Sequence, residues 1–385
     1  MQSMPSFHPS LTRTCIAAVF FVNGFVFASW VPHIPAVMDR HTLTTGQLGA
    51  VLLAMAVGAM LALPFAGSVV ARFGSRATTA FCALGFCLTL PLPVLAPTAW
   101  LAAAALFVFG VLNATLDVAM NAQGAELEHR VQRPIMSSFH GCFSLGGLAG
   151  AGSAAALLEW GMRPHVHVLT TAALSALVVV AASRALLPSP PVQGDLKPKF
   201  VFPSRALLGL GMLTFAALLI EGAMADWSAV FLRRERGLDA GGAALGYAAF
   251  SLTMAAARFA GDAIAHRVGP LKLVRVSALL AFIGLVLALF VPQSGVSIAG
   301  FGLVGFGMAN LIPLLFSAAA RARPGEPGAG IAAVATTGYL GFIAGPPLIG
   351  VIADWTGLTA ALGLLVALCI GIFAASRAVM PPAKA

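Results

Sequence analysis

AWLAAAALFVFGVLNATLDVAMNAQ, residues 99–123, contains a single charged side chain, Asp117. A helix needs about 20 mostly apolar residues to cross the ~30 Å hydrocarbon layer of a bilayer, so this stretch predicts a membrane-spanning helix. Apolar stretches of similar length recur along the whole chain. The other eleven are 14–37, 47–70, 77–96, 135–158, 165–187, 206–231, 243–265, 273–291, 296–319, 329–352 and 358–376. The sequence therefore predicts an all-α membrane protein with twelve transmembrane helices.

Composition excludes a water-soluble enzyme. Hydrophobic residues make up 59% of the chain and charged residues 9%, and the mean hydropathy is +0.94. Soluble domains carry roughly 25% charged residues, so this chain has too little polar surface to coat a soluble globule. The five cysteines lie in apolar stretches without a CxxC spacing, which indicates neither a zinc site nor a disulfide framework. They are Cys15, Cys82, Cys87, Cys142 and Cys369.

The net charge of +9 is explained by topology rather than by a nucleic-acid partner. Short cytoplasmic loops hold more Lys and Arg than translocated loops do. With twelve spans, 16 of the 22 basic residues fall on the side of the two termini. The opposite side holds Arg40, Arg163, Arg233, Arg234 and Arg236, and Arg258 lies inside a span. We expect an inner-membrane protein with both termini in the cytoplasm.

An internal repeat divides the chain. When the second half is shifted by about 195 to 197 residues, Trp30 falls on Trp227 and Glu159-Trp160 on Asp354-Trp355. The other matches are Asn23-Gly24 with Glu221-Gly222, Leu48-Gly49 with Leu245-Gly246, Gly110-x-x-Asn113 with Gly307-x-x-Asn310, Arg72-x-Gly74 with Arg267-x-Gly269, and Gly146 and Gly150 with Gly341 and Gly345. A proline-rich stretch lies near mid-chain. We predict a six-helix bundle over 1–187, a cytoplasmic linker over 188–203 and a second bundle over 204–385.

Six helices in each half preserve orientation, so the halves should be related by a pseudo-two-fold axis along the membrane normal. A substrate site is then expected near the midplane where they meet, served by alternating access.

The loop after the second span reads Gly67-Ser-Val-Val-Ala71-Arg72-Phe-Gly74-Ser75-Arg76. It resembles the signature Gly-x-x-x-Asp-Arg-x-Gly-Arg-Lys of the major facilitator superfamily, with Ala71 at the Asp position. A looser copy runs from Gly261 to Gly269 and includes Asp262 and Arg267. The resemblance covers essentially the whole chain. It implies the major facilitator fold and gating roles for Arg72, Gly74, Arg76, Arg267 and Gly269.

Within that superfamily, Asn113-Ala-Thr-Leu-Asp117-Val-Ala-Met-Asn121 resembles the Leu-Glu-Thr-x-x-Asn element of fucose-permease-like sugar:proton symporters. Asp117 stands where those proteins have a protonatable glutamate, and Asn121 where they have asparagine. The first span carries Asn23 and no acid.

Asn113, Asp117 and Asn121 recur at i, i+4 and i+8, so they share one face of a helix. Asp117 would lie roughly 20 Å from the cytoplasmic end, where a charged Asp costs about 2.5–3.5 kcal/mol on insertion scales. We predict a proton carrier at Asp117. A substrate hydrogen-bond acceptor and a structural pair remain as alternatives.

The second half contributes acids and one basic residue inside spans. Glu221 is a predicted second proton carrier or substrate ligand, with a salt bridge to Arg258 or a water-solvated cavity residue as the alternatives. Asp226 is interpreted as interfacial. Arg258 and Asp262 are four residues apart on one helical face and predict an intrahelical gating pair. An anion-binding Arg258, which would make the substrate a carboxylate, is the alternative.

Five further residues complete the predicted site. His140 could relay protons or hold helices together. Trp30 and Trp227 are either interfacial anchors or platforms that stack on a substrate ring. Asn23 and Asn310 could hydrogen-bond the substrate or link helices.

These features predict a secondary active transporter, with proton-coupled uptake of a small, sugar-like polar metabolite as the leading hypothesis. Efflux of amphiphiles and transport of an organic anion are the alternatives. Walker, HExxH and GxSxG sequences are absent, which disfavours ATP drive and a membrane-embedded enzyme. We expect a monomer whose partners are the lipid bilayer and a small-molecule substrate, with no nucleic acid, no metal and no cofactor beyond the coupling proton.

Overall fold

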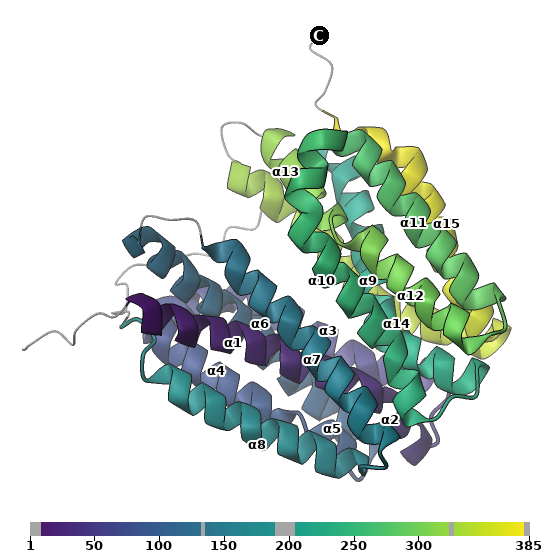
Figure 1. The fold of residues 1–385 in the computed structure, drawn as a ribbon, viewed down its shortest axis with the longest axis horizontal. Coiled ribbons are helices and arrows are strands. Elements are labelled where there is room, and N and C mark those ends of the chain that lie inside the picture. The colour runs from purple at the N-terminus through teal and green to yellow at the C-terminus, as the bar shows by residue number, and fades with distance from the viewer. Residues whose placement is uncertain (1–8, 132–134, 189–204, 323–326, 381–385) are drawn as a thin grey trace, which may run out of the picture. The chain divides into compact units, whose positions relative to one another are not determined.

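A computed structural model describes residues 9–131, 135–188, 205–322 and 327–380. Every regular element in these ranges is helical (Figure 1). The first half contains α1 (Pro9–Trp30), η1 (Val31–His33), α2 (Ile34–Arg40), α3 (Thr45–Phe73), α4 (Ser75–Thr89), α5 (Leu92–Leu95), α6 (Ala99–Val131), α7 (Met136–Glu159) and α8 (Pro164–Ser183). The second half contains α9 (Arg205–Glu235), α10 (Ala240–Val268), α11 (Pro270–Phe290), α12 (Ser294–Met308), α13 (Leu311–Ala322), α14 (Pro327–Thr356), α15 (Leu358–Ala375) and η2 (Ser376–Val379).

Twelve segments within the described residues are long and apolar enough to cross a membrane, which confirms the predicted number of spans. The segment that contains Asp117 runs from Ala99 to Glu128, against a predicted 99–123. The predicted boundaries lie within about five residues of those observed; α10, whose side chains are described as far as Arg258, runs from Ala240 to Val268 against a predicted 243–265.

Three predicted spans are not continuous helices. The first bends through η1, where Pro32 and Pro35 follow each other closely, and the third breaks between α4 and α5 beside Pro91. The tenth breaks at Ala309 and Asn310, between α12 and α13. Proline lacks an N–H and clashes with the preceding turn, which accounts for the first two breaks. The break in the tenth span frees backbone carbonyls inside the membrane-spanning region, and these carbonyls need a polar partner.

The chain divides into two compact units, counting only the described residues in each range. One comprises Met1–Trp30, Ala54–Gly150 and Arg163–Pro198; the other comprises Val31–Leu53, Ala151–Met162 and Lys199–Ala385. The second unit thus includes short segments from the first half of the sequence. The domain boundaries drawn from sequence remain a prediction, and nearly all of the predicted linker, 188–203, lies outside the described residues.

Close helix crossings repeat in the two halves. In the first unit, a Cβ on Gly110 of α6 would overlap the carbonyl oxygen of Met55 in α3. In the second unit, a Cβ on Gly305 of α12 would overlap the carbonyl oxygen of Phe250 in α10. Gly305 follows Gly110 by 195 residues, and Phe250 follows Met55 by the same number. The repeat in the sequence is therefore also a repeat of backbone contacts. Glycine lets membrane helices approach at these points.

The crossing of α7 with α1 gives a stability prediction. A Cβ on Gly146 would overlap the carbonyl oxygen of Phe21 and come 3.0 Å from the amide nitrogen of Phe25, whereas the nearest atom to a Cβ on Gly147 is 4.0 Å away. Gly146→Ala is therefore expected to lower the free energy of unfolding by about 1–3 kcal/mol, and Gly147→Ala by less than about 0.5 kcal/mol. Thermal unfolding in detergent measures both. Equal melting temperatures for the two variants would contradict the crossing.

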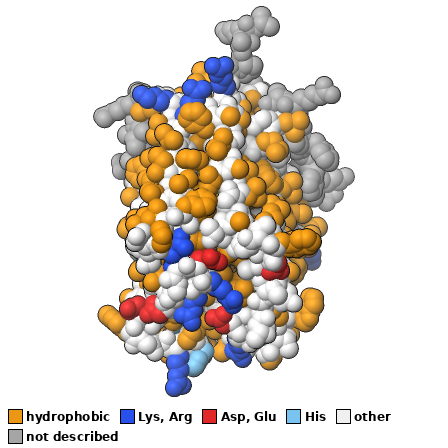
Figure 2. Space-filling view, turned by 90° about the vertical axis from the view of Figure 1, so that its right-hand side faces the viewer, with side chains coloured by type: hydrophobic (Ala, Val, Ile, Leu, Met, Phe, Trp, Pro, Cys, Tyr) orange, Lys and Arg blue, Asp and Glu red, His pale blue; other side chains and the backbone are white. Residues whose placement is uncertain are grey.

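Exposed tryptophans mark one end of three spans. The exposed fractions are 86% for Trp100 at the start of α6, 81% for Trp160 after α7 and 87% for Trp355 at the end of α14. Twelve alternating spans place these three helix ends on the same side of a bilayer, where tryptophan is enriched at the lipid interface. On the face shown in Figure 2, apolar side chains cover the middle, and acidic and basic side chains gather together in the lower part.

Candidate functional site

Two exposed faces of α6 differ in chemistry. Leu101 and Val108 are exposed on one face, as expected of a helix in contact with lipid. Asp117 is also exposed, and Asn113 and Asn121 are partly exposed. Val108 and Asp117 are nine residues apart, which is about two and a half helical turns, so their side chains lie on opposite sides of α6. The face of Asp117 therefore points away from the lipid-like face, and its polar groups need water or a solute.

Asn121 restrains the Asp117 carboxylate. Its Nδ2 donates to Asp117 Oδ1 at 3.1 Å and to the Asp117 carbonyl oxygen at 2.8 Å. The predicted structural pair thus exists, yet the carboxyl keeps an exposed side on which a proton or a solute hydroxyl can bind. The sequence-based hypotheses of a proton carrier and of a substrate acceptor both remain compatible with this geometry.

Polar groups on α1 and α7 belong to the same unit as Asp117. Asn23 is 2% exposed; its Nδ2 donates to Met120 Sδ at 3.6 Å and its Oδ1 has no partner among the described residues. His140 is exposed on α7 and packs edge-on against Phe20, with ring centroids 5.4 Å apart. Trp30 is 2% exposed, which excludes the interfacial-anchor interpretation.

The second unit contains a separate charged cluster. Glu221 of α9 is largely buried, and its Oε2 lies 3.9 Å from Arg258 Nη2 of α10. Its Oε1 is buried and has no hydrogen-bond partner in the described part of the chain. The alternative of a Glu221–Arg258 ion pair is therefore correct, although the pair is loose. Oε1 is therefore a buried acceptor whose hydrogen bonding is unsatisfied within the described residues.

The break between α12 and α13 faces this cluster. Arg258 Nε donates to the carbonyl oxygen of Ala309 at 3.4 Å, and Asn310 Nδ2 donates to the carbonyl oxygen of Ala257 at 3.3 Å. Arg258 thus satisfies a carbonyl at the helix break, and 37% of its side chain is still exposed. Asn310 links α10 to the broken helix, as the interhelical alternative anticipated.

Sequence reasoning misjudged one residue near this cluster, Asp226, and overlooked another, Tyr247. Asp226 is 6% exposed, so the interfacial interpretation was wrong. Tyr247 of α10 is 9% exposed and lies near Glu221, Asp226 and Arg258. Only two tyrosines occur in the chain, and that rarity was the one sequence signal for Tyr247. Trp227 is fully buried, and its Nε1 has no partner in the described ranges.

The predicted gating residues lie where α3 meets α4 and where α10 meets α11. Gly74 and Gly269 have φ values of 80° and 81° and begin α4 and α11, a left-handed conformation that favours glycine. Arg76 donates to the carbonyl oxygens of Ser183 and Arg184 at 3.2 and 3.1 Å. The guanidinium of Arg72 lies over Phe73, 5.4 Å from the ring centroid. The side chains of Asp262 and Arg267 lie outside the described residues, so their predicted gating contacts do too.

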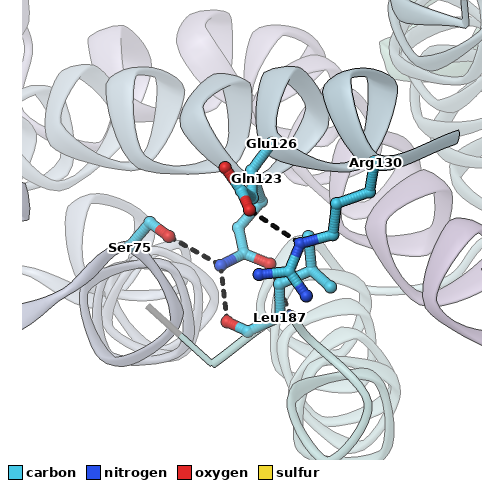
Figure 3. Close-up of polar contacts among 5 residues, drawn as sticks. All are labelled: Ser75, Gln123, Glu126, Arg130 and Leu187. Carbon is cyan, nitrogen blue, oxygen red and sulfur yellow. Dashed lines mark hydrogen bonds and ion pairs between the residues drawn. The ribbon is translucent and has the colours of Figure 1, made fainter. Parts of the chain in front are cut away.

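Sequence reasoning missed Gln123 of α6, which joins the start of α4 to the segment that follows α8 in the first unit (Figure 3). Its Nε2 donates to Ser75 Oγ at 2.7 Å and to the Leu187 carbonyl oxygen at 3.0 Å, and its Oε1 accepts from the Leu187 N–H at 2.8 Å. Nearby on α6, Arg130 pairs with Glu126 at 2.7 Å on the surface. Gln123 is fully buried and both ends of its amide are hydrogen-bonded within the protein, so its role is structural.

No group of three or more metal-binding side chains occurs in the residues that the structure describes. The chemistry available in each unit is hydrogen bonding, proton binding and charge pairing. None of the groups described above is a nucleophile activated by a neighbouring base.

Comparisons with known proteins agree on one family. The sequence matches the Major Facilitator Superfamily over residues 16–225 and 210–385. An uncharacterized MFS-type transporter of Yersinia pestis is 39% identical over 94% of both chains. Membrane protein MosC of Rhizobium meliloti is 35% identical over 95% of this chain and 89% of that protein.

Solved structures share the fold at low identity. A point mutant of the nucleoside transporter NupG superimposes with a TM-score of 0.80 at 13% identity, covering 96% of this chain and 100% of that chain. A D-xylose-proton symporter superimposes with a TM-score of 0.76 at 14% identity, covering 96% and 97%.

Proposed function

Because the chain belongs to the major facilitator superfamily and is a multi-pass membrane transporter, we propose that it takes up a small, sugar-like polar metabolite together with protons. In this proposal both termini lie in the cytoplasm, the protein acts as a monomer in the inner membrane, and Asp117 carries the coupling proton. The fold shared with a D-xylose-proton symporter is compatible with such a cycle. The distribution of Lys and Arg supports the orientation.

The observation that carries the proposal is the exposed polar face of α6. Asp117 lies between Asn113 and Asn121 on the side of the helix opposite Val108. A carboxyl held at mid-membrane and open to water can exchange a proton, whereas a lipid-facing carboxyl could not do so at an acceptable cost. Asn121 orients the carboxyl without closing it.

The charged cluster of the second unit supports a neutral, hydroxyl-rich solute. Arg258 supplies N–H donors and Glu221 supplies acceptor oxygens: Oε2 lies 3.9 Å from the Arg258 guanidinium, and Oε1 has no hydrogen-bond partner in the described residues. A hydroxyl group donates and accepts at once, so adjacent hydroxyls could bind both members of the pair. A carboxylate solute would meet Arg258 but would be repelled by Glu221.

A ligand screen tests the solute class. Purified protein is heated with sugars and polyols, with carboxylates, and with amphiphilic amines, since a compound that binds only the native state raises the melting temperature. A polyol that stabilises the protein is then tested for accumulation in proteoliposomes under an inward proton gradient. Stabilisation by carboxylates alone would favour the organic-anion alternative. Stabilisation by amphiphiles alone would favour efflux, and either result would refute the proposed solute.

A further inference from the structure

Contacts in the second unit join helix ends that come from both halves of the sequence. These ends lie on the side opposite the chain termini and are called the distal end here. At the end of α2, Asp39 Oδ1 accepts from Arg234 Nη2 at 2.9 Å, and Asp39 Oδ2 lies 3.9 Å from Arg233 Nε. Arg233 and Arg234 occupy the last turn of α9. The ion pair therefore links the first span to the seventh.

A second distal contact places the carboxylate of Asp354, in the last turn of α14, on the N-terminus of α3. Oδ2 accepts from Thr44 Oγ1 at 2.9 Å, and Oδ1 accepts from Thr45 Oγ1. The first N–H groups of a helix lack intrahelical acceptors and carry partial positive charge, so an anion there is stabilised.

A third distal contact places Glu159, at the end of α7, on the first turn of α10. A Cβ on Gly241 would lie 2.5 Å from Glu159 Oε2 and 2.9 Å from its Cα, so only glycine permits this approach. At the second contact, a Cβ on Gly46 would likewise overlap the Asp354 carboxylate. Glycine at the helix start thus makes room for an acid in both places.

All three contacts involve residues that are related by the 195-residue repeat. Asp39 and Arg234 are 195 residues apart. The same separation relates Glu159 to Asp354 and Gly46 to Gly241. The pair Asp39–Arg234 therefore joins two equivalent positions of opposite charge. The two acid-on-glycine contacts are equivalent to each other, each joining one half of the sequence to the other.

We infer that Asp354 and Glu159 are positioning residues of the transport cycle, which hold the distal helix ends closed by capping the first turns of α3 and α10. The Asp39–Arg234 pair completes this distal latch. Release of the latch lets α3 separate from α14 and α10 from α7. The inference rests on alternating access but not on the solute or the coupling ion of the proposed function.

The two acids should contribute unequally. Asp354 accepts hydrogen bonds from the side chains of Thr44 and Thr45 at the start of α3. The start of α10 already has its own cap, because Asp239 Oδ1 accepts from the Gly242 N–H at 2.7 Å. Neutralising Asp354 should therefore open the distal end more than neutralising Glu159 does. Loss of charge-assisted hydrogen bonds of this kind shifts an equilibrium by roughly tenfold or more.

The test measures distal opening without a solute. Nitroxide labels are attached to cysteines introduced at Ala50 of α3 and Ala360 of α15, both exposed, after the five native cysteines are replaced. Electron paramagnetic resonance gives the distance distribution in lipid nanodiscs. Asp354→Asn should lower the ratio of short to long distances about tenfold. Glu126→Gln, which neutralises a surface acid paired with Arg130, should leave it unchanged.

Two further variants keep the test decisive if Asp354→Asn does not fold. The double substitution Thr44→Val and Thr45→Val removes the hydroxyl donors from the other side of the contact and should give the same shift. Gly241→Ala should also lengthen the distances, because its Cβ displaces Glu159, whereas Gly295→Ala at the start of α12 has nothing within 4 Å and should not. Unchanged distributions in the threonine double variant and in Gly241→Ala would overturn the latch.

Discussion

Asp117→Asn is expected to abolish uphill accumulation of the solute while solute exchange continues at close to the wild-type rate. Asparagine keeps the size and the hydrogen bonding of the side chain but cannot bind and release a proton. The polar face of α6 would still accept a solute, and only the link to the proton gradient would be lost. Accumulation under a proton gradient and exchange between solute-loaded proteoliposomes measure the two activities separately.

The matched control is Glu126→Gln on the same helix, whose carboxylate pairs with Arg130 at the surface. It should preserve both accumulation and exchange. Concentrative uptake by the Asp117→Asn protein would refute proton coupling at this residue. Loss of both activities would instead assign Asp117 to solute binding, which is the alternative that its hydrogen bond with Asn121 leaves open.

Arg258→Ala is expected to reduce solute affinity about 10–100-fold and to destabilise the protein by about 1–2 kcal/mol. The substitution leaves Glu221 largely buried without its cation and leaves the Ala309 carbonyl without its side-chain donor. The stability loss should fall short of that for a fully buried pair, because the two groups are 3.9 Å apart and Arg258 is 37% exposed. Ligand titration and thermal unfolding measure the two effects.

A double variant separates the effect of the unpaired Glu221 charge on stability from the effect of Arg258 on solute affinity. Adding Glu221→Gln to Arg258→Ala removes the uncompensated carboxylate, so stability should recover while affinity should not. Arg130→Ala, in an exposed pair, should change neither quantity appreciably. If Arg258→Ala binds the solute normally, the second-unit cluster is not part of the solute site.

Some features of the site followed from short-range patterns. Asn113, Asp117 and Asn121 share a face because helical geometry places residues four apart on one side. Gly146 and Gly341 stood out as repeated small residues, and both would overlap a neighbouring backbone if they carried a Cβ. These patterns depend on the chain near each residue, so they can be read without knowing the fold.

Other features depend on partners far away in the sequence. Trp30 and Trp227 sit near span ends, as interfacial residues do, yet tertiary packing buries both. Asp226 was placed at the interface for the same reason and is buried too. Gln123 drew no notice because its partners, Ser75 and Leu187, are 48 and 64 residues away. Depth along a helix could be counted from the sequence, but the direction of each side chain toward lipid or protein could not.

The sequence by itself determined the membrane class, the number of spans and the repeat, because the bilayer sets a fixed apolar length and a duplicated segment keeps its spacing. The tertiary structure alone decided which charged groups meet. Asp354 lies on the first turn of α3, about 310 residues away, and Glu221 lies beside Arg258 at the break after α12. Hydropathy adds up locally along the chain, whereas the partner of a buried or capping charge is fixed only when distant helices pack together.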